Sequence, residues 1–274
     1  MDAAGLTTHV AEAGEGEPVV MLHGWPQHWY EWRKLIGPLA ERYRVICPDL
    51  RGLGWTDAPP NGYEKEQLAA DVLALLDELA LEKVRLVGHD WGGWVGYLLC
   101  LRAPERFERY VALNILPPLI APSARSLLGL WRLWYQWVIA APVIGERCVR
   151  MLATNPVLRW IGGQEDTWTD EEREQFFGQF RERERARASV QYYRTFQLKE
   201  LPRLPLLYRE AYLRVPTRIL FGTSDKVQQA SALEGIERRG EDLAYELFPG
   251  VGHFIAEERP DLVLDRTLSF FSAA

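Results

Sequence analysis

Apolar segments of strand type alternate with amphipathic helical segments through the first third of this 274-residue chain. The helical segments, at 32–42 and 64–80, place apolar residues at intervals of three and four. The strand-type segments are almost entirely apolar, as strands covered on both faces must be; they are VVMLHG (19–24), YRVICPD (43–49) and VRLVGHD (84–90). This repetition predicts a mostly parallel sheet with right-handed crossovers, flanked by helices.

The alternation stops at about residue 118 and resumes at about residue 214. Only helical signals occur in between, including a capping-box sequence in which Glu172 follows Thr169 by three residues. These helices are expected at 126–140, from Thr169 through 196, and at 204–213. Further strands are expected at 108–114, 217–223 and 243–250, with a closing helix from about Ala256. We therefore predict an α/β core of residues 1–117 and 214–274, interrupted by an all-helical insertion over 118–213.

Composition and charge are those of an ordinary globular protein. Hydrophobic residues make up 47% and charged residues 26%, which excludes a disordered or fibrous chain. The 32 basic and 38 acidic residues leave a net charge of −6 and form no basic patch, so no nucleic-acid partner is expected. Cys47, Cys100 and Cys148 cannot form a disulfide framework, and the N-terminus has no signal-peptide pattern. We expect a cytoplasmic protein without membrane insertion.

The most specific motif is Gly88-His89-Asp90-Trp91-Gly92, between an apolar strand and a helical segment. It has the form of the strained strand-to-helix elbow that carries a nucleophile, with Asp90 where esterases carry serine. Glycines let the strand and helix approach closely, and the helix start favours a negative charge. The alternative is that Asp90 merely caps the helix.

Other residues follow in the order that such an elbow requires. Asp225 follows the strand at 217–223 and His253 follows the strand at 243–250, which matches the order nucleophile, acid, histidine. The backbone N–H groups of Trp25 and Trp91 are candidates for an oxyanion hole, although the loop at Trp25 could be an ordinary turn. No residues have metal-ligand spacing, and Arg51-Gly52-Leu53-Gly54 lacks the third glycine of a dinucleotide site. We therefore expect neither metal nor cofactor.

Taken together, HGWPQ, PDLRGLGWTD, VGHDWGG, FGTSD and GVGHF resemble motifs of the α/β-hydrolases in the epoxide hydrolase and haloalkane dehalogenase branch, and the chain looks most like a bacterial soluble epoxide hydrolase. The resemblance implies an α/β-hydrolase fold, a helical cap over 118–213 and aspartate as the nucleophile. It also implies two cap tyrosines that hydrogen-bond the oxirane oxygen. Tyr135 and Tyr193 have similar placements, with Trp134 and Tyr192 as alternatives in neighbouring registers. Each tyrosine could instead be a core residue.

Two departures from related enzymes weigh against dehalogenation. Haloalkane dehalogenases usually place asparagine after the HG of the first loop, where this chain has Trp25. Fluoroacetate-type dehalogenases carry arginine after the nucleophile, where this chain has Trp91. The indole N–H of Trp91 could still serve as one halide donor, which keeps a haloalkane or haloacetate dehalogenase as the alternative.

The expected activity is conversion of a small hydrophobic epoxide and water to a vicinal diol through an ester on Asp90. Asp225 and His253 would activate the water, and Trp134, Tyr192 and Phe254 are the expected substrate-binding residues. The aromatic cap favours an apolar pocket, although its exposed aromatic residues could instead form a homodimer interface. A non-catalytic small-molecule-binding protein on the same scaffold is a more distant alternative.

Overall fold

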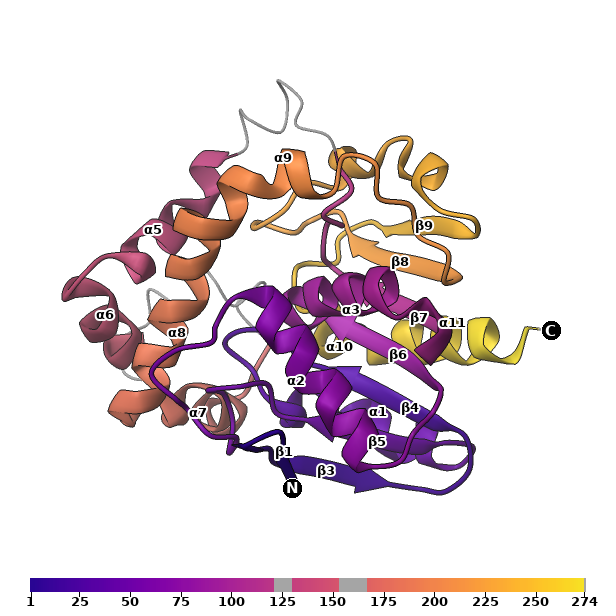
Figure 1. Ribbon diagram of the computed structural model, residues 1–274, viewed down its shortest axis with the longest axis horizontal. Helices are drawn as coiled ribbons and strands as arrows, with labels where there is room; N and C mark the ends of the chain where they lie inside the picture. The colour runs from indigo at the N-terminus through magenta and orange to yellow at the C-terminus, as the bar shows by residue number, and fades with distance from the viewer. Residues whose placement is uncertain (121–129, 153–166, 274) are drawn as a thin grey trace.

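The computed structural model describes residues 1–120, 130–152 and 167–273. Within them, a seven-stranded sheet with the order β3-β5-β4-β6-β7-β8-β9 forms the centre (Figure 1). Only β3 pairs antiparallel with its neighbour; the other pairings are parallel, which confirms the predicted mostly parallel sheet. The strands are β3 (Val10–Ala13), β4 (Pro18–Leu22), β5 (Arg44–Pro48), β6 (Val84–His89), β7 (Phe107–Leu113), β8 (Thr217–Gly222) and β9 (Leu243–Phe248).

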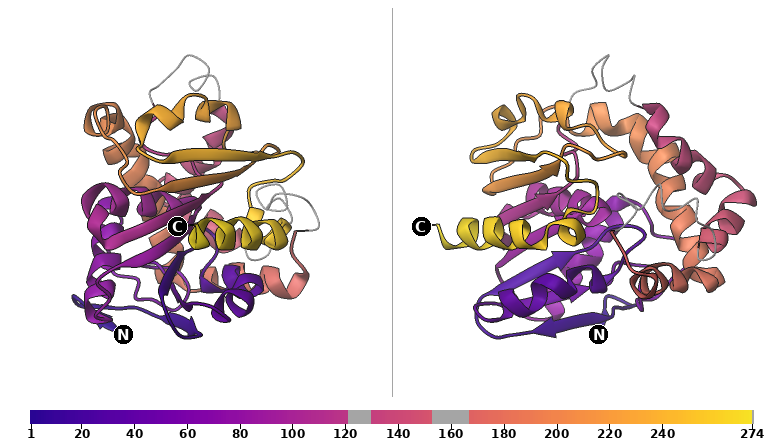
Figure 2. Two further views of the ribbon diagram at one scale, coloured as in Figure 1. Left: turned by 90° about the vertical axis from the view of Figure 1, so that its right-hand side faces the viewer. Right: turned by 180° about the vertical axis from the view of Figure 1, so that it is seen from behind.

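Helices cover both faces of this sheet (Figures 1 and 2). On one face α1 (Arg33–Ala40) packs against α11 (Pro260–Ser272), and on the other α2 (Lys65–Glu78) packs against α3 (Asp90–Arg102). Successive side chains of a strand point to opposite faces. In β4, accordingly, Val19 and Met21 belong to one buried apolar cluster and Val20 and Leu22 to the other. This double burial explains why the central strands are apolar throughout.

Short elements complete the core. They are the two-stranded ribbon β1 (Asp2–Ala3) and β2 (Leu6–Thr7), the 3-10 turns η1 (Trp29–Trp32), η2 (Pro104–Arg106), η8 (Ala230–Leu233) and η9 (Ile236–Arg239), and the short helix α10 (Ile255–Glu258). His9 lies between β2 and β3, and its ring nitrogen lies 2.9 Å from the carboxylate of Asp49.

The insertion is helical in its described parts and covers one end of the sheet (Figure 2). Its main helices α5, α6 and α8 pack together, at the left of Figure 1. The helical elements are η3 (Leu130–Leu133), α5 (Trp134–Ala140), α6 (Ile144–Leu152), α7 (Asp170–Gly178), η5 (Gln179–Arg181), α8 (Arg183–Thr195), the π-helical turn η6 (Phe196–Glu200), η7 (Leu201–Arg203) and α9 (Leu204–Leu207). The predicted segment 126–129 lies outside the described residues.

Two helix predictions in this insertion need correction. The single helix expected through residue 196 is divided into α7, η5 and α8, although its capping box at Thr169 and Glu172 is confirmed. The helix expected at 204–213 ends at Leu207, because the chain turns there so that Leu213 can bridge to Gly240 beside the sheet.

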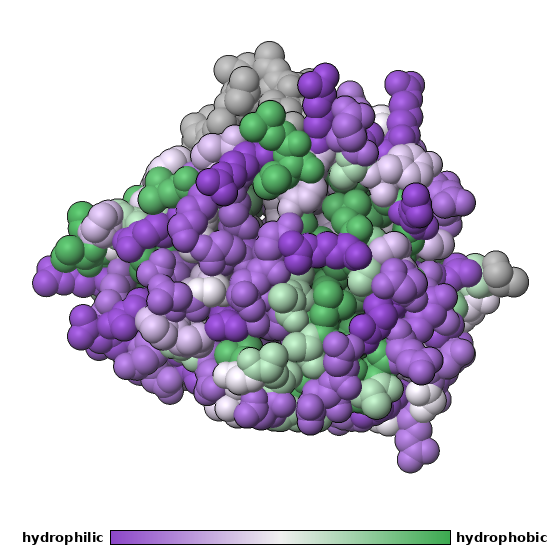
Figure 3. Space-filling view, in the orientation of Figure 1, coloured by the Kyte–Doolittle hydropathy of each residue, from purple (hydrophilic) through white to green (hydrophobic). Residues whose placement is uncertain are grey.

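The outer surface of the insertion carries exposed apolar side chains within a mostly hydrophilic face (Figure 3). They include Leu206 and Leu207 of α9 and Val143 and Ile144 at the start of α6. In the part of the chain that the structure describes, no helix has the length and apolar character needed to cross a membrane.

Candidate active site

Asp90 lies at the junction of β6 and α3, with its backbone in the left-handed region at φ +48°. Glycines make this turn possible, because a Cβ on Gly92 would collide with the carbonyl oxygen of Leu22 and one on Gly24 would collide with the Asp90 side chain. The N-cap residue of α3 is His89, and its side chain makes no capping bond. The geometry is therefore that of the predicted elbow, and the alternative in which Asp90 is the N-cap is wrong.

The Asp90 carboxylate is held by the loop after β4. The backbone N–H of Trp25 donates to Asp90 Oδ1 at 2.9 Å. Trp91, whose backbone N–H is the other expected donor, is the second residue of α3 and is 5% exposed. The two tryptophans thus occupy the two positions that supply an oxyanion hole in this type of site: the loop after an early strand and the residue after the nucleophile.

Asp225 and His253 meet beside Asp90, as their order in the sequence predicts. Asp225 follows β8 and His253 follows β9, and His253 Nδ1 donates to Asp225 Oδ2 at 2.8 Å. The other ring nitrogen, Nε2, lies 3.6 Å from Asp90 Oδ2. Asp225 is fixed in turn by the side-chain amide of Asn114, at 2.8 Å, and by the backbone N–H of Val227, at 2.6 Å.

The charges of these three groups are strongly coupled. Burial alone would lower the pKa of His253, but the carboxylates of Asp225 and Asp90 outweigh it and raise the pKa to about 10. Burial alone would raise the pKa of Asp90, but the hydrogen bond and charge of His253 outweigh it and lower the pKa. In the same way the pKa of Asp225 is lowered. The resting site therefore holds an imidazolium between two carboxylates.

Tyr135 of α5 and Tyr193 of α8 lie over this site. Both are buried, and their ring centroids are 6.1 Å apart. The Tyr193 ring also packs edge-on against Trp25, at 5.3 Å, and against Trp91, at 5.6 Å. Burial raises the pKa of both phenols, and the negative charge of Asp90 contributes to the same shift. Both hydroxyls therefore stay protonated at neutral pH.

The other expected substrate-binding residues have different environments. Trp134 is 49% exposed, whereas Tyr135, the next residue of α5, is buried. Tyr192 is buried, but its hydroxyl donates to the carbonyl of Arg51 at 2.9 Å, within the loop below the cap. Phe254 is buried beside His253, with ring centroids 5.0 Å apart. Tyr135 and Tyr193, and not the alternatives Trp134 and Tyr192, therefore lie close to each other over the site.

A buried ion pair that the sequence does not predict lies beneath the site. Glu31 Oε1 lies 2.7 Å from His89 Nδ1, and His89 Nε2 donates to the carbonyl oxygen of His253 at 2.9 Å. Burial would lower the pKa of His89, but Glu31 outweighs it and raises the pKa. The pair therefore supports the backbone of the catalytic histidine. No sequence signal marked Glu31, because it lies within an aromatic segment that gives no indication of which side chain is buried.

No metal site is evident in the described residues: no group of three or more His, Cys, Asp or Glu side chains is placed to hold an ion.

Comparison with known proteins gives consistent matches. Residues 17–145 match the family described as alpha/beta hydrolase fold. A soluble epoxide hydrolase from Corynebacterium sp. (strain C12) is 47% identical over 116 residues, covering 42% of this chain and 41% of that protein. Epoxide hydrolase 1 of Siraitia grosvenorii is 28% identical over 94% of this chain and 92% of its own length. The solved structure of epoxide hydrolase CorEH without ligand has a TM-score of 0.80 and 29% identity, covering 99% of this chain and 97% of that one.

The sheet order, the elbow and the family match show that the protein has the α/β-hydrolase fold, with a helical insertion and an aspartate at the elbow. The similar proteins and solved structures include several named epoxide hydrolases.

Proposed function

We propose that the protein is an epoxide hydrolase that converts small hydrophobic epoxides to vicinal diols through an ester on Asp90. The observation that carries the proposal is a carboxylate at the elbow, bound by the Trp25 N–H and placed 3.6 Å from His253, with two buried phenols above it. A carboxylate can form an alkyl ester with a strained epoxide. We expect poor cleavage of ordinary esters.

In the first half-reaction, Asp90 attacks an oxirane carbon and the carbon–oxygen bond of the ring breaks. Tyr135 and Tyr193 donate hydrogen bonds to the departing oxygen, and one of them supplies its proton, which it later recovers from solvent. A phenol suits this role because it is protonated at neutral pH yet acidic enough to protonate an alkoxide. The product is an alkyl ester of Asp90.

Ester formation itself prepares the second half-reaction. It removes the negative charge of Asp90, one of the two carboxylates that hold the His253 pKa high. The pKa therefore falls, His253 releases its proton, and the neutral imidazole can take a proton from water. The hydroxide attacks the Asp90 carbonyl carbon, while the Trp25 and Trp91 N–H groups stabilise the oxyanion. Collapse releases the diol and restores the carboxylate.

The proposed substrate is hydrophobic because aromatic side chains surround Tyr193. Phe180 stacks on Trp25, with ring centroids 5.9 Å apart, and Phe196 packs against Trp91 at 4.9 Å. Such a lining binds apolar groups, leaving orientation to a few polar groups. A cytoplasmic location and a homodimer are further parts of the proposal. The first is supported by three free cysteines and the second by the exposed aromatic residues Trp134 and Trp137 of α5.

The proposal is tested by stopping the reaction between its two halves. In His253→Gln, ring opening should proceed while ester hydrolysis is blocked. Incubation with an epoxide that the wild type hydrolyses should then raise the intact mass by the mass of that epoxide, and peptide mapping should place the adduct on Asp90. Asp90→Asn combined with His253→Gln is the control and should remain unmodified. An unmodified His253→Gln protein would contradict the mechanism.

Dehalogenation by the same nucleophile is the alternative. The indole N–H of Trp25 donates to Ser189 Oγ at 3.0 Å, so this group is already engaged and is not aimed at a halide. Replacing both Tyr135 and Tyr193 with phenylalanine should abolish epoxide opening, because the leaving oxygen loses its donors. Any haloalkane or haloacetate turnover should be comparatively unaffected. Haloalkane turnover in the wild type without diol formation would favour the alternative.

A further inference from the structure

Lys65, the first residue of α2, is completely buried although it is charged. Its ammonium group lies 4.6 Å from the centre of the Trp91 ring, over the aromatic face. Burial lowers the pKa of Lys65, and the carboxylates of Glu200, Glu64 and Asp90 oppose that shift. A buried ammonium loses its favourable hydration, and an apolar side chain would fill the same space without that loss.

The ammonium group is bound to the last turn of cap helix α8. It donates to the carbonyl oxygen of Tyr192 at 2.7 Å and to that of Tyr63 at 3.2 Å. It also pairs with Glu200 Oε2 at 3.1 Å, and the backbone N–H of Lys65 donates to the other oxygen of Glu200 at 2.8 Å. A cation at the C-terminal end of a helix is favoured by the helix dipole.

These contacts join the two halves of the proposed reaction site. Trp91 follows Asp90 directly, and Tyr192 precedes Tyr193 directly. One side chain of the core therefore touches the neighbour of the nucleophile and the neighbour of a proposed acid. The α-helical hydrogen bonding also changes here, since α8 passes into the π-helical turn η6 at Phe196. Such π-turns occur frequently at functional sites.

We propose that Lys65 is a positioning residue that holds the Tyr193 end of α8 at a fixed height above the Asp90 elbow. This inference rests on the proposed epoxide hydrolase activity. Lys65 acts on ring opening, the step that needs Tyr193. It has little influence on ester hydrolysis, which depends on His253 and the N–H groups of Trp25 and Trp91, because Lys65 contacts the ring of Trp91 and not its backbone.

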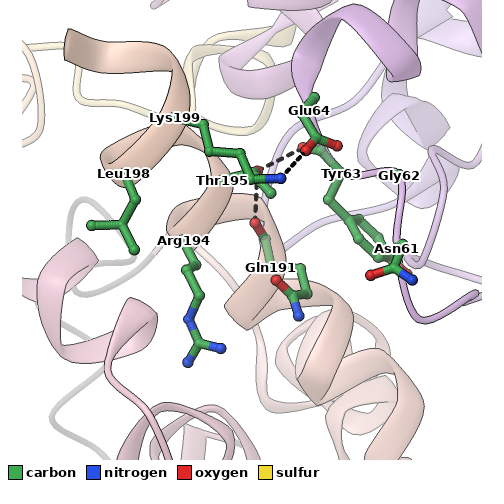
Figure 4. A pocket seen from close by; sticks show the side chains of 9 residues that line it. All are labelled: Asn61, Gly62, Tyr63, Glu64, Gln191, Arg194, Thr195, Leu198 and Lys199. Atoms are coloured by element: carbon green, nitrogen blue, oxygen red, sulfur yellow. Dashed lines mark hydrogen bonds and ion pairs between the residues drawn. The ribbon is translucent and has the colours of Figure 1, made fainter.

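The outer side of the same contact offers a matched control. Figure 4 shows a surface pocket along the seam between the 61–64 loop and α8, where the Thr195 hydroxyl lies within hydrogen-bond distance of the carbonyl oxygens of Tyr63 and Gln191. Lys199 pairs with Glu64 across this seam, and its side chain is 62% exposed. Lys199 thus joins the loop to the cap as Lys65 does, but among the described residues its ion pair is with Glu64, away from Trp91 and Tyr192.

The test measures the two half-reactions separately in single-turnover experiments, following alkyl-enzyme formation and decay by quenched-flow mass spectrometry. Lys65→Met should slow ester formation by about 100-fold, the loss expected when a reacting group is displaced by about 1 Å. Its ester hydrolysis should stay within about threefold of the wild type, because the oxyanion donors and His253 remain in place. Lys199→Met should change neither rate by more than about twofold, as expected for an exposed ion pair.

A double-mutant cycle shows whether Lys65 acts through Tyr193. Tyr193→Phe should slow ester formation strongly in the wild type and only slightly in Lys65→Met, because the phenol is already displaced there. Additive losses, or equal slowing of both half-reactions, would overturn the proposal. If Lys65→Met does not fold, the same cycle is carried out with Glu200→Gln. This substitution removes the negative charge that pairs with Lys65, at a side chain that is partly exposed. Failure of the wild type to form any alkyl-enzyme would overturn the epoxide hydrolase proposal itself, and this inference with it.

Discussion

Asp90 has a backbone conformation that L-residues adopt at a cost, at φ +48°. Strain of this kind persists only where the surroundings fix it, and here Gly24 and Gly92 leave room for the turn. In this backbone conformation the Asp90 side chain points away from α3 and accepts the hydrogen bond from the Trp25 N–H. Aspartate tolerates the left-handed region better than most residues, so its presence at the elbow fits the backbone as well as the chemistry.

The charge of Asp90 should control the protonation of His253. We predict that Asp90→Asn lowers the His253 pKa from about 10 toward the ordinary value of about 6.5, because one of the two carboxylates that raise it is removed. The imidazolium should then be lost at lower pH than in the wild type. Nitrogen-15 NMR titration of the ring measures this directly. Asp261→Asn, at an exposed pair with Arg259, is the control and should leave the His253 titration unchanged. An unshifted titration in Asp90→Asn would show that the two groups are not coupled.

Asp90, Asp225 and His253 are predictable from the sequence because their order along the chain carries the information. The parallel sheet places the ends of its strands at one edge, so residues after β6, β8 and β9 meet there. Glu31 and Lys65 are not predictable in this way. Local patterns describe which positions of a helix are apolar, whereas the burial of a single charged residue depends on partners more than 50 residues away, such as His89 for Glu31 and Tyr192 for Lys65.

At the scale of the elements, strands were predicted more accurately than cap helices. Central strands are buried on two faces, so their composition alone marks them, and β4 to β9 agree with the expected ranges within two residues. The division between α7 and α8 has no such local mark, since charged residues favourable to helices continue through it at 181–187. Packing determines the break: Gln179 of η5 donates to the carbonyl oxygen of Pro26 and accepts from the N–H of Gly54.

The capping box of α7 gives a prediction at this scale. Thr169 Oγ1 accepts from the N–H of Glu172 at 3.2 Å, and Glu172 accepts from the N–H of Thr169 at 2.9 Å. Thr169→Ala should lower the free energy of unfolding by about 1 kcal/mol, the usual effect of losing such a cap. Thr169→Ser keeps the acceptor and should be nearly neutral. Urea denaturation measures both variants, and equal stability of Thr169→Ala and the wild type would mean that the cap contributes nothing.

At the scale of the whole molecule, polar contacts with loops of the core join the cap to the core, beside an apolar cluster to which both contribute. Arg185 of α8 donates to the carbonyl of Thr56, and Tyr192 donates to that of Arg51. At the other side of the cap, the guanidinium of Arg33 bonds both Glu172 of α7 and Glu257 of α10. Directed contacts of this kind fix one cap orientation, which the tyrosines need if they are to lie over Asp90.

Arg33 should therefore stabilise the assembled molecule. Glu257 is buried, and burial raises its pKa although Arg33 and Lys34 act in the opposite direction. Arg33→Met removes the main partner of this carboxylate, and we expect the free energy of unfolding at pH 7 to fall by about 3 kcal/mol, as when one member of a buried pair is removed. Arg181→Ala, which breaks an exposed pair with Glu174, is the control and should have no measurable effect.

The decrease in the free energy of unfolding caused by Arg33→Met should depend on pH, and the direction of this dependence identifies its cause. A carboxyl group with a raised pKa in the folded state binds its proton more tightly when folded than when unfolded. The penalty of the unpaired Glu257 charge is thus complete above the folded pKa, and it disappears as pH falls toward the unfolded value of about 4.3. Urea unfolding curves from pH 7 to pH 4.5 should show the difference between Arg33→Met and the wild type shrinking as the solution becomes more acidic. A difference that stays constant over this range would mean that Arg33 stabilises the joint between cap and core by packing of its side chain and not by its charge.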